Sequence, residues 1–428
     1  MDIAISRGRI AAISSHLSLK GEEIDGHGGT LLPGLHDHHL HLAATAARRQ
    51  SVSLANLVNE SAVMAALRQS GSPIVRAVDY DERAAGLPDA ALLDSWEPSR
   101  PLRLTDRTGA LWVLNTAALR LIGDITLPPG AERDAGGRPN GRFWREDAWL
   151  RRALPLAEPD ISALGAEMSA VGLTGVTDAT AHNGPEEALY LAGQVPQRLV
   201  LMGGTRLAAG HGYSLGALKV MIDERDPPLL SEMSALIAIA RAQRRGVAAH
   251  CVTEAELALY LAALEEAGAA RPGDRVEHGG LMTPELISAV AAARLTVVTN
   301  PSFIYGRGDR YLAQIPPEHW EHLYPAGSLA RAGVPMLGGS DAPYGVLDPW
   351  IAMRAARDRL TAGGQTIGIS QRISPERALK LYCSGVIAPG RPADLILCNG
   401  TWHEVLRDLT AERVDLTIIQ GAVAFIRN

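Results

Sequence analysis

The chain has 428 residues, of which 46% are hydrophobic and 21% charged, so it can bury a large core. Its formal net charge of −6 offers no basic surface for nucleic acid, which we therefore exclude as a partner. The sequence contains no run of about 18 apolar residues that could span a bilayer, and its first residues lack the pattern of a signal peptide. We expect a cytoplasmic protein with no membrane partner, and the scattered Cys251, Cys383 and Cys398 agree with a reducing compartment.

The two ends of the chain predict one small β-domain. Residues 3–13 alternate around an Arg-Gly-Arg turn, and residues 394–398 and 414–425 are rich in strand-forming side chains. Neither end is long enough for a domain of its own. We therefore predict a composite β-sandwich of residues 1–32 and 388–428, with residues 33–387 between its halves.

The stretch from Leu31 to His41 holds four histidines and an aspartate after a Pro-Gly turn. A strand points alternate side chains to one face, so His39 and His41 present two imidazoles on the same side. A polar loop with chance histidines would give the same local pattern. Three later segments that each end in a metal-type ligand favour a metal site.

Residues 43–160 have a mixed pattern that differs from the rest of the chain. Segments 74–78 and 101–104 resemble strands, and segment 109–121 resembles a helix. We predict an inserted subdomain here.

From residue 161 onward, helical segments alternate with short apolar strands, which is typical of parallel βαβ units. The predicted helices include 254–267, 284–293 and 325–332. The predicted strands are residues 35–41, 175–179, 198–203, 218–223, 246–250, 275–278, 295–300 and 334–341. Eight such units predict an α/β fold, a (β/α)8 TIM barrel, in which reactive side chains gather at the carboxyl ends of the strands.

His250, His278 and Asp341 each close one of these strands. Each of them alone could be a structural residue. Together with His39 and His41 they place four imidazoles and a carboxylate on one rim of the barrel. That donor set suits zinc or another first-row divalent metal, with one position left open for water.

Lys219 lies inside an otherwise apolar strand. A buried ammonium group is costly, so this lysine needs a partner, a lowered pKa or covalent modification. A salt bridge to Asp223 or Glu224 is one solution. Reaction with carbon dioxide is another, because the resulting carbamate can bridge two metal ions, which would lower the pKa of a shared water toward about 7.

These motifs, in this order, resemble those of the amidohydrolase superfamily. The tail is also similar to that superfamily's closing signature, in Ser374-Pro-Glu-Arg-Ala-Leu and Ile387-Ala-Pro-Gly-Arg-Pro-Ala-Asp394. Within the superfamily, the chain is most similar to amidohydrolase family 3, the branch that contains N-substituted formamide deformylase. This second resemblance rests on residues 115–119, 137–141 and 218–223.

The resemblance implies a role for each ligand. His39, His41 and Asp341 would hold one metal, His250 and His278 a second, and carboxylated Lys219 would bridge them. Asp341, Lys219 and His278 would be the catalytic residues. Asp341 would act as general base, taking a proton from the bridging water and delivering it to the leaving nitrogen.

The chain departs from that branch in two regions that face the substrate. Thr108-Gly109-Ala110 stands where the branch usually has Asp-Gly-His, so one pocket histidine is missing. The chain is also shorter between Asp223 and the strand of His250. Candidate substrate-binding residues near the rim are His182, His211, Tyr213, Asn300, Tyr305 and Arg307.

The leading hypothesis is a metal-dependent hydrolase that cleaves a non-peptide C–N bond, an amide or an N-acyl or N-formyl group, of a small molecule by attack of a metal-bound hydroxide. One alternative is a mononuclear deaminase or cyclic amidine hydrolase, in which His39, His41, His250 and Asp341 hold one metal. In that alternative His278 positions the water and Lys219 is structural. A third hypothesis is a non-catalytic barrel that binds a small molecule. A homodimer is an expectation for a barrel of this size.

Overall fold

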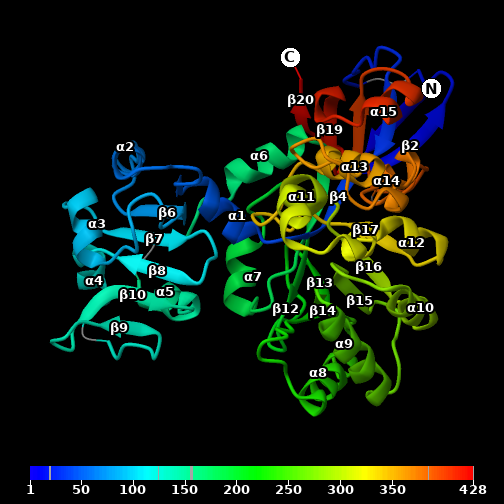
Figure 1. Cartoon of the computed structure of the whole chain (residues 1–428). Coiled ribbons are helices and arrows are strands. Elements are labelled where there is room, and N and C mark those ends of the chain that lie inside the picture. Colours follow the sequence, from blue (N-terminus) through cyan, green and yellow to red (C-terminus); the bar gives the residue numbers. More distant parts are fainter. Residues whose placement is uncertain (19–20, 124, 155–157, 384, 428) are drawn as a thin grey trace. The chain divides into compact units, whose positions relative to one another are not determined.

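The computed structural model describes residues 1–18, 21–123, 125–154, 158–383 and 385–427 (Figure 1). The chain divides into two compact units. One comprises Met1–Thr45 and Ile161–Asn428, and the other comprises Ala46–Asp160. The helix α1 (Leu42–Arg49) carries the chain from the first unit into the second.

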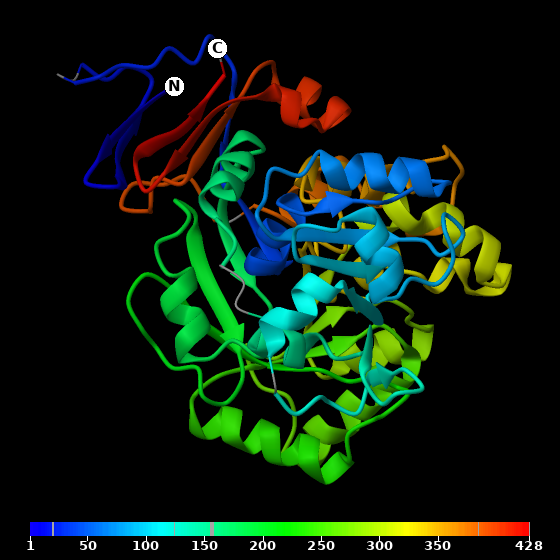
Figure 2. The same cartoon turned by 90° about the vertical axis from the view of Figure 1, so that its left-hand side faces the viewer.

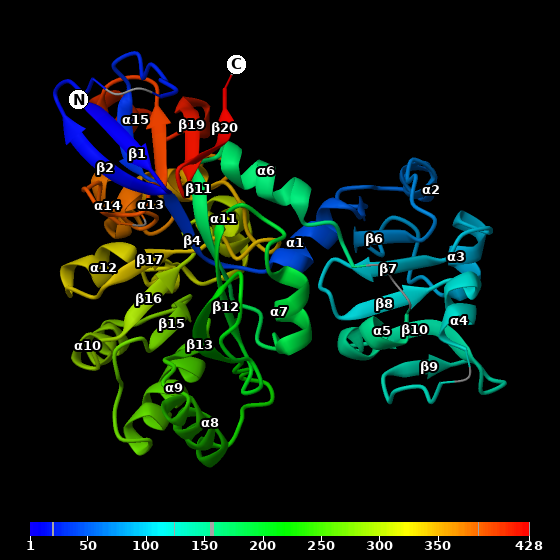
Figure 3. The ribbon, with the colours of Figure 1, turned by 180° about the vertical axis from the view of Figure 1, so that it is seen from behind.

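The first unit contains an eight-stranded sheet in the order β17-β16-β15-β14-β13-β12-β11-β4 (Figure 3). Its strands are β4 (Leu35–Leu40), β11 (Leu173–Asp178), β12 (Arg198–Gly203), β13 (Ser214–Val220), β14 (Val247–Cys251), β15 (Arg275–His278), β16 (Thr296–Thr299) and β17 (Met336–Gly338). All neighbouring pairs in this sheet are parallel. The predicted strands therefore form one parallel sheet.

The two edge strands of this sheet meet just beyond β17. The backbone N–H of Asp341 donates to the carbonyl of His39 at 2.7 Å, and that of His41 donates to Ala342 at 2.9 Å. Gly339 packs so closely on β4 that an added Cβ would lie 2.5 Å from the Cβ of His39. The sheet thus nearly closes on itself, and the predicted TIM barrel is confirmed.

Helices cover the outside of the barrel. They are α6 (Ser162–Ala170), α7 (Pro185–Leu191), α8 (Leu230–Ala242), α9 (Glu254–Glu266), α10 (Pro284–Ala292), α11 (Ser302–Gln314), α12 (Ala326–Arg331), α13 (Pro349–Asp358) and α14 (Pro375–Lys380). Every residue of β11 is buried, as expected for a parallel strand covered on both faces. Thr253 and Thr283 cap α9 and α10, each accepting a hydrogen bond from a backbone N–H two residues into the helix.

Both ends of the chain contribute antiparallel sheets to the first unit, and both termini lie there (Figure 2). Strands β1 (Asp2–Ser6) and β2 (Arg9–Ser14) form one sheet. The other has the order β20-β19-β18-β3 and comprises β3 (Thr30–Pro33), β18 (Leu395–Cys398), β19 (Val414–Ile419) and β20 (Ala422–Ile426). Ile10, Leu395 and Leu416 share one apolar cluster. The limits of the composite sandwich, 1–32 and 388–428, stay a prediction.

The second unit is built on a six-stranded sheet in the order β5-β6-β7-β8-β10-β9. Its elements are β5 (Val52–Ser53), α2 (Glu60–Arg68), β6 (Val75–Tyr80), α3 (Ala90–Trp96), β7 (Leu102–Asp106), β8 (Leu111–Leu114), α4 (Thr116–Ile122), β9 (Ala131–Arg133), β10 (Pro139–Trp144) and α5 (Asp147–Ala153). The helix predicted over 109–121 is wrong at its start, because Leu111–Leu114 pairs with β7 and β10. Asn115 then caps α4 by accepting from the N–H of Ala118.

The short elements that remain are α15 (Trp402–Asp408) and the 3-10 turns η1 (Pro317–His322), η2 (Ile369–Gln371) and η3 (Ala411–Arg413). Within the described ranges, no helix combines the length and the apolar composition needed to cross a membrane. The cytoplasmic location stays a prediction.

Candidate metal centre

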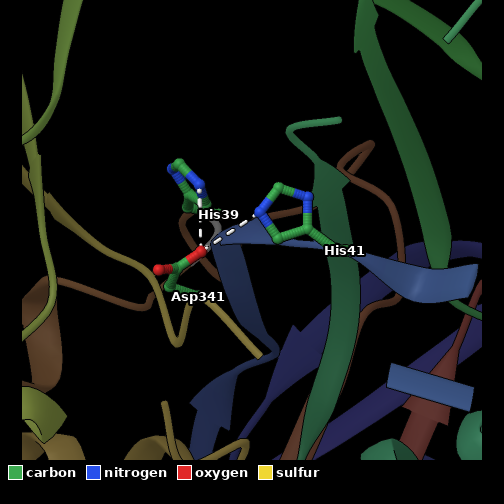
Figure 4. Close-up of side chains that lie close together, drawn as sticks. All are labelled: His39, His41 and Asp341. Atoms are coloured by element: carbon green, nitrogen blue, oxygen red, sulfur yellow. Dashed lines mark hydrogen bonds and ion pairs between the residues drawn. The ribbon is translucent and has the colours of Figure 1, made fainter. Parts of the chain in front are cut away.

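His39, His41 and Asp341 lie together where β4 meets the end of β17 (Figure 4). Nε2 of His41 is 3.2 Å and Nε2 of His39 is 3.4 Å from Oδ1 of Asp341. One ligand atom from each residue falls within 4.8 Å of the other two. His39 and Asp341 are buried and His41 is half-buried, so His41 is the most accessible of the three.

His278 and His250 extend this group along the rim. The imidazole rings of His39 and His278 are 4.7 Å apart between centroids, and those of His278 and His250 are 4.6 Å apart. Nε2 of His278 lies 3.0 Å from Nδ1 of His250. The four predicted histidines and Asp341 therefore meet in one region, as expected for the last residues of barrel strands.

Two site residues have a left-handed backbone conformation that non-glycine residues rarely adopt. The φ angles are 71° at His278 and 54° at Asp341. Such conformations cost on the order of 1–3 kcal/mol and cluster at functional sites, where the surrounding structure holds them. At Asp341 the hydrogen bond to His39 supplies that support.

Lys219 on β13 is 5% exposed, and its Nζ forms no hydrogen bond within the described part of the chain. A hydrogen-bonded salt bridge to Asp223 or Glu224 is therefore not formed. Burial lowers the pKa of Lys219, while the nearby carboxylates of Glu277 and Asp341 oppose the shift. An uncharged amine in this position is nucleophilic toward carbon dioxide.

Glu277, which the sequence analysis missed, is fully buried beside the site. Its Oε2 accepts a hydrogen bond from Nδ1 of His39, and its Oε1 forms an ion pair with Arg275. Burial raises the pKa of Glu277, but Arg275, Lys219 and His39 together hold it well below the usual range. The one feature of the sequence that could have pointed to Glu277 is its Arg-x-Glu spacing with Arg275 within a short barrel strand.

Asp37 joins β4 to the loop after β17. Its Oδ1 accepts from the backbone N–H groups of His39 and Ser340, both at 3.0 Å. Burial raises the pKa of Asp37 to about 6.

The ring of His36 stacks on that of His38, with 4.3 Å between the ring centroids. Burial lowers the pKa of His36 to about 3. His36 and His38 therefore pack on each other.

The candidate substrate residues lie in two kinds of place. Asn300 is fully buried, with its Oδ1 2.8 Å from Nδ1 of His278 and its Nδ2 2.8 Å from the carbonyl of Gly339. Arg307 lies on α11, stacks on Phe303 and donates to the carbonyl of Tyr344 at 2.8 Å. The substrate contacts of Asn300 and Arg307 stay predictions.

The other four candidates lie on loops or on the outer part of a helix. His182 and His211 are exposed, and Tyr305 on α11 is exposed as well. Tyr213 donates to the carbonyl of Ala208 in its own loop. Their substrate contacts also stay predictions.

Tyr344, which the sequence analysis did not single out, lies close to the site. Its ring meets that of His41 edge to face at 5.9 Å, and it is 62% exposed. The backbone N–H of Tyr344 donates to the carbonyl of Asp341, which closes a tight turn. An exposed aromatic side chain therefore lies beside His41, the half-buried member of the group.

The residues present fit a divalent metal. Imidazole nitrogens and a carboxylate oxygen are the ligands that zinc and related ions prefer. The compact group of His39, His41 and Asp341 supplies three of them, and the unpaired Nζ of Lys219 is buried nearby. The identity of the metal and the number of ions stay predictions.

A (β/α)8 barrel with histidines and a carboxylate at the carboxyl ends of its strands is the architecture of a metal-dependent hydrolase. A sequence model of the amidohydrolase family matches residues 22–425. The chain therefore belongs to the amidohydrolase family, and the resemblance seen in its motifs is confirmed. It is a hydrolase that acts on carbon–nitrogen bonds.

Known proteins are similar to this chain in sequence or in fold. N-substituted formamide deformylase of Arthrobacter pascens is 26% identical over 486 residues, covering 93% of this chain and 89% of the relative. An uncharacterized metal-dependent hydrolase from Pyrococcus horikoshii has a similar structure, with a TM-score of 0.77 at 17% identity and coverage of 93% of each chain. A hydrolase of the same description from Pyrococcus furiosus has a TM-score of 0.74 at 18% identity, covering 93% of this chain and 95% of its own.

Proposed function

We propose that this protein hydrolyses a non-peptide C–N bond, an amide or an N-acyl or N-formyl group, of a small molecule. The observation that carries the proposal is the compact group of His39, His41 and Asp341 beside the buried, unpaired amine of Lys219. Similarity to a deformylase supports an N-acyl or N-formyl substrate. The missing pocket histidine at Ala110 and the short segment after Asp223 leave the acyl and amine groups to be found by experiment.

In this proposal each residue of the centre has one task. His39, His41 and Asp341 would hold one ion, preferably zinc, and His250 and His278 would hold a second. In its uncharged form, which the lowered pKa favours, the Lys219 amine would attack carbon dioxide, forming one N–C bond and releasing one proton. The resulting carbamate would supply anionic oxygen ligands to the centre.

The bound metal would lower the pKa of a water molecule and polarise the substrate carbonyl. Asp341 acts as the general base. Burial raises the pKa of Asp341, but its contacts with His39 and His41 hold it well below the usual range, so the carboxylate can accept a proton. It takes the proton from the attacking water and delivers it to the leaving nitrogen as the C–N bond breaks, which yields a carboxylic acid and an amine.

A second candidate is a mononuclear deaminase or cyclic amidine hydrolase. The observation in its favour is that the compact group comprises three residues that suffice for one ion. Lys219 then has a structural role, and His278 positions the attacking water.

The test is a screen of N-formyl amines, other amides, lactams and aminoheterocycles, with the protein stripped of metal and then reloaded with zinc. We expect release of an amine from an amide or N-formyl substrate only in the reloaded protein. Release of ammonia from an aminoheterocycle would favour the second candidate. Tight binding without turnover across the panel would indicate a non-catalytic barrel.

A further inference from the structure

Three histidines of the site share one arrangement: Nδ1 is held by a partner outside the metal group. Nδ1 of His39 contacts Glu277. Nδ1 of His41 lies 2.9 Å from Oγ1 of Thr180, and Nδ1 of His278 lies 2.8 Å from Oδ1 of Asn300. In His39 and His41 the other nitrogen, Nε2, points toward Asp341 (Figure 4).

The chemistry of two partners determines where the hydrogen lies. An ionised carboxylate can only accept, so Nδ1 of His39 must carry the hydrogen toward Glu277. The amide nitrogen of Asn300 donates to the carbonyl of Gly339, which turns its oxygen toward His278. Nδ1 of His278 must therefore donate as well, so the lone pair of its ring lies on Nε2, which faces Nδ1 of His250 at 3.0 Å.

Thr180 differs from these two partners because a hydroxyl group can donate or accept. It orients the ring of His41 but does not fix which nitrogen carries the hydrogen. The three Nδ1 partners therefore differ in charge and in hydrogen-bonding capacity. They are a buried carboxylate at His39, an amide oxygen at His278 and a hydroxyl at His41.

We propose that Glu277 is a positioning residue that holds Nδ1–H of His39 and makes Nε2 of His39 the strongest imidazole ligand of the metal centre. This inference rests on the proposed metal centre. Asn300 acts in the same way on His278, with a neutral oxygen in place of a charged one.

The surroundings of Glu277 hold its carboxylate in place before any metal arrives. Arg275 pairs with Oε1 and also donates to Oε2 at 3.2 Å and to the carbonyl of His38 at 2.7 Å. The guanidinium of Arg275 thus connects β15 to β4 across the barrel, directly beside His39. A carboxylate that bonds the second nitrogen of a ligating histidine raises the basicity of the first, and its loss lowers metal affinity by about 10–100-fold.

A purely structural role for Glu277 makes a different prediction. The buried pair of Arg275 and Glu277 would then stabilise the barrel, and its removal would lower the melting temperature of the metal-free protein without changing metal affinity. The metal affinity of a folded variant separates the two roles.

The experiment measures zinc affinity by competition with a chromophoric chelator, for wild type, E277Q, E277D and T180V. We expect E277Q to lose about 10–100-fold in affinity, and T180V, the matched control at His41, to lose less. E277D keeps the charge but shortens the side chain, so it tests the contact if E277Q does not fold. Wild-type affinity in folded E277Q or E277D would overturn the inference.

A spectroscopic measurement keeps the inference testable without any variant of Glu277. In zinc-loaded wild type labelled with ¹⁵N-histidine, we expect His39, assigned by loss of its signals in His39→Gln, to show zinc on Nε2 and a hydrogen on Nδ1. Zinc on Nδ1 of His39 would overturn the inference and leave the proposed hydrolase intact. A wild-type protein that binds no zinc-type metal would overturn the metal centre itself.

Discussion

Lys219 is a side chain that the barrel has removed from water without providing a hydrogen-bond partner within the described residues. Leaving an ammonium group in that state would cost several kcal/mol. The lowered pKa of Lys219 reduces that cost, and the proposed conversion to a carbamate would avoid it. In the proposed centre, the chemical state of Lys219 therefore decides between one and two metal ions.

For Lys219→Ala we expect kcat/KM to fall about 100-fold or more, together with the loss of about one metal ion per chain. Lys219→Glu supplies a carboxylate in the same strand, so this variant should keep part of the activity and part of the metal content. Metal content and steady-state kinetics on the substrate found by the screen check the pair of variants. Full turnover by Lys219→Ala would contradict a bridging role.

Asp341 allows a substitution that leaves the backbone undisturbed. Its φ of 54° is tolerated by asparagine better than by most residues, so Asp341→Asn should fold. An amide cannot accept the proton of the attacking water, and we expect kcat to fall about 100- to 10,000-fold. The measurement is kcat with metal content determined on the same sample. Near wild-type kcat with full metal loading would show that another group is the base.

At the scale of elements, the close approach of β17 and β4 positions His39 next to Asp341. A Cβ at Gly339 would lie 2.5 Å from Cβ and 3.0 Å from N of His39. We expect Gly339→Ala to destabilise the first unit by about 1–3 kcal/mol and to reduce metal content, because β4 must move away. Urea unfolding and metal analysis check this.

Gly306 on α11 is the matched control for Gly339. No atom lies within 4 Å of a Cβ built there. Gly306→Ala should be neutral or stabilise by about 1 kcal/mol, since alanine favours the helix. Equal effects of the two substitutions would contradict the role of the β17–β4 contact.

In the second unit, the buried Glu97 forms an ion pair with Arg100. It accepts hydrogen bonds from Ser99 and Arg100, and Arg100 also donates to the carbonyls of Ser70 and Ser72. Hydrogen bonding to Arg100 lowers the pKa of Glu97 from 4.5 to about 2, against the effect of burial. A depressed acid pKa means that the stabilisation is present above about pH 4.5 and is lost as the pH falls through about 2.

We therefore expect Glu97→Gln to weaken hydrogen-exchange protection around residues 67–72 by about 1–3 kcal/mol at pH 7. The difference from wild type should shrink as the pH falls from about 4.5 toward 2, because wild-type Glu97 then becomes protonated. A difference that stays constant over that range would contradict the ionised pair.

Much of the barrel was predictable, because parallel strands covered on both faces appear in the sequence as short apolar runs between helices. The histidine and aspartate ligands were predictable for the same reason, since each lies at or just beyond the carboxyl end of such a run. Segment 109–121 was not, because Leu111–Leu114 is apolar in either structure and its pairing with β7 and β10 decides it.

The contact of His39 with Glu277 could not be read from the sequence. The two residues are 238 positions apart, and no local pattern states which strands face each other across a barrel. A charged residue in a short strand also matches a solvent-facing position. The same limit applies to Asn300, whose amide reaches both His278 and Gly339.

At the scale of the whole molecule, the proposed centre joins segments from opposite ends of the barrel sequence. His39 lies on β4 and His41 follows its last residue, while Asp341 follows β17 some 300 positions later. Ions held by both segments would stabilise the closed barrel, by about 2.7 kcal/mol when free metal is 100 times its dissociation constant. Metal content therefore reports on both fold and chemistry.

The most direct measurement is the metal content and amide-hydrolysing activity of the purified protein, prepared with and without bicarbonate. We predict about two zinc-type ions per chain and activity that bicarbonate restores after its removal, as a carbamate on Lys219 requires. About one ion per chain, with activity indifferent to bicarbonate, would contradict the bridged centre and favour a mononuclear deaminase.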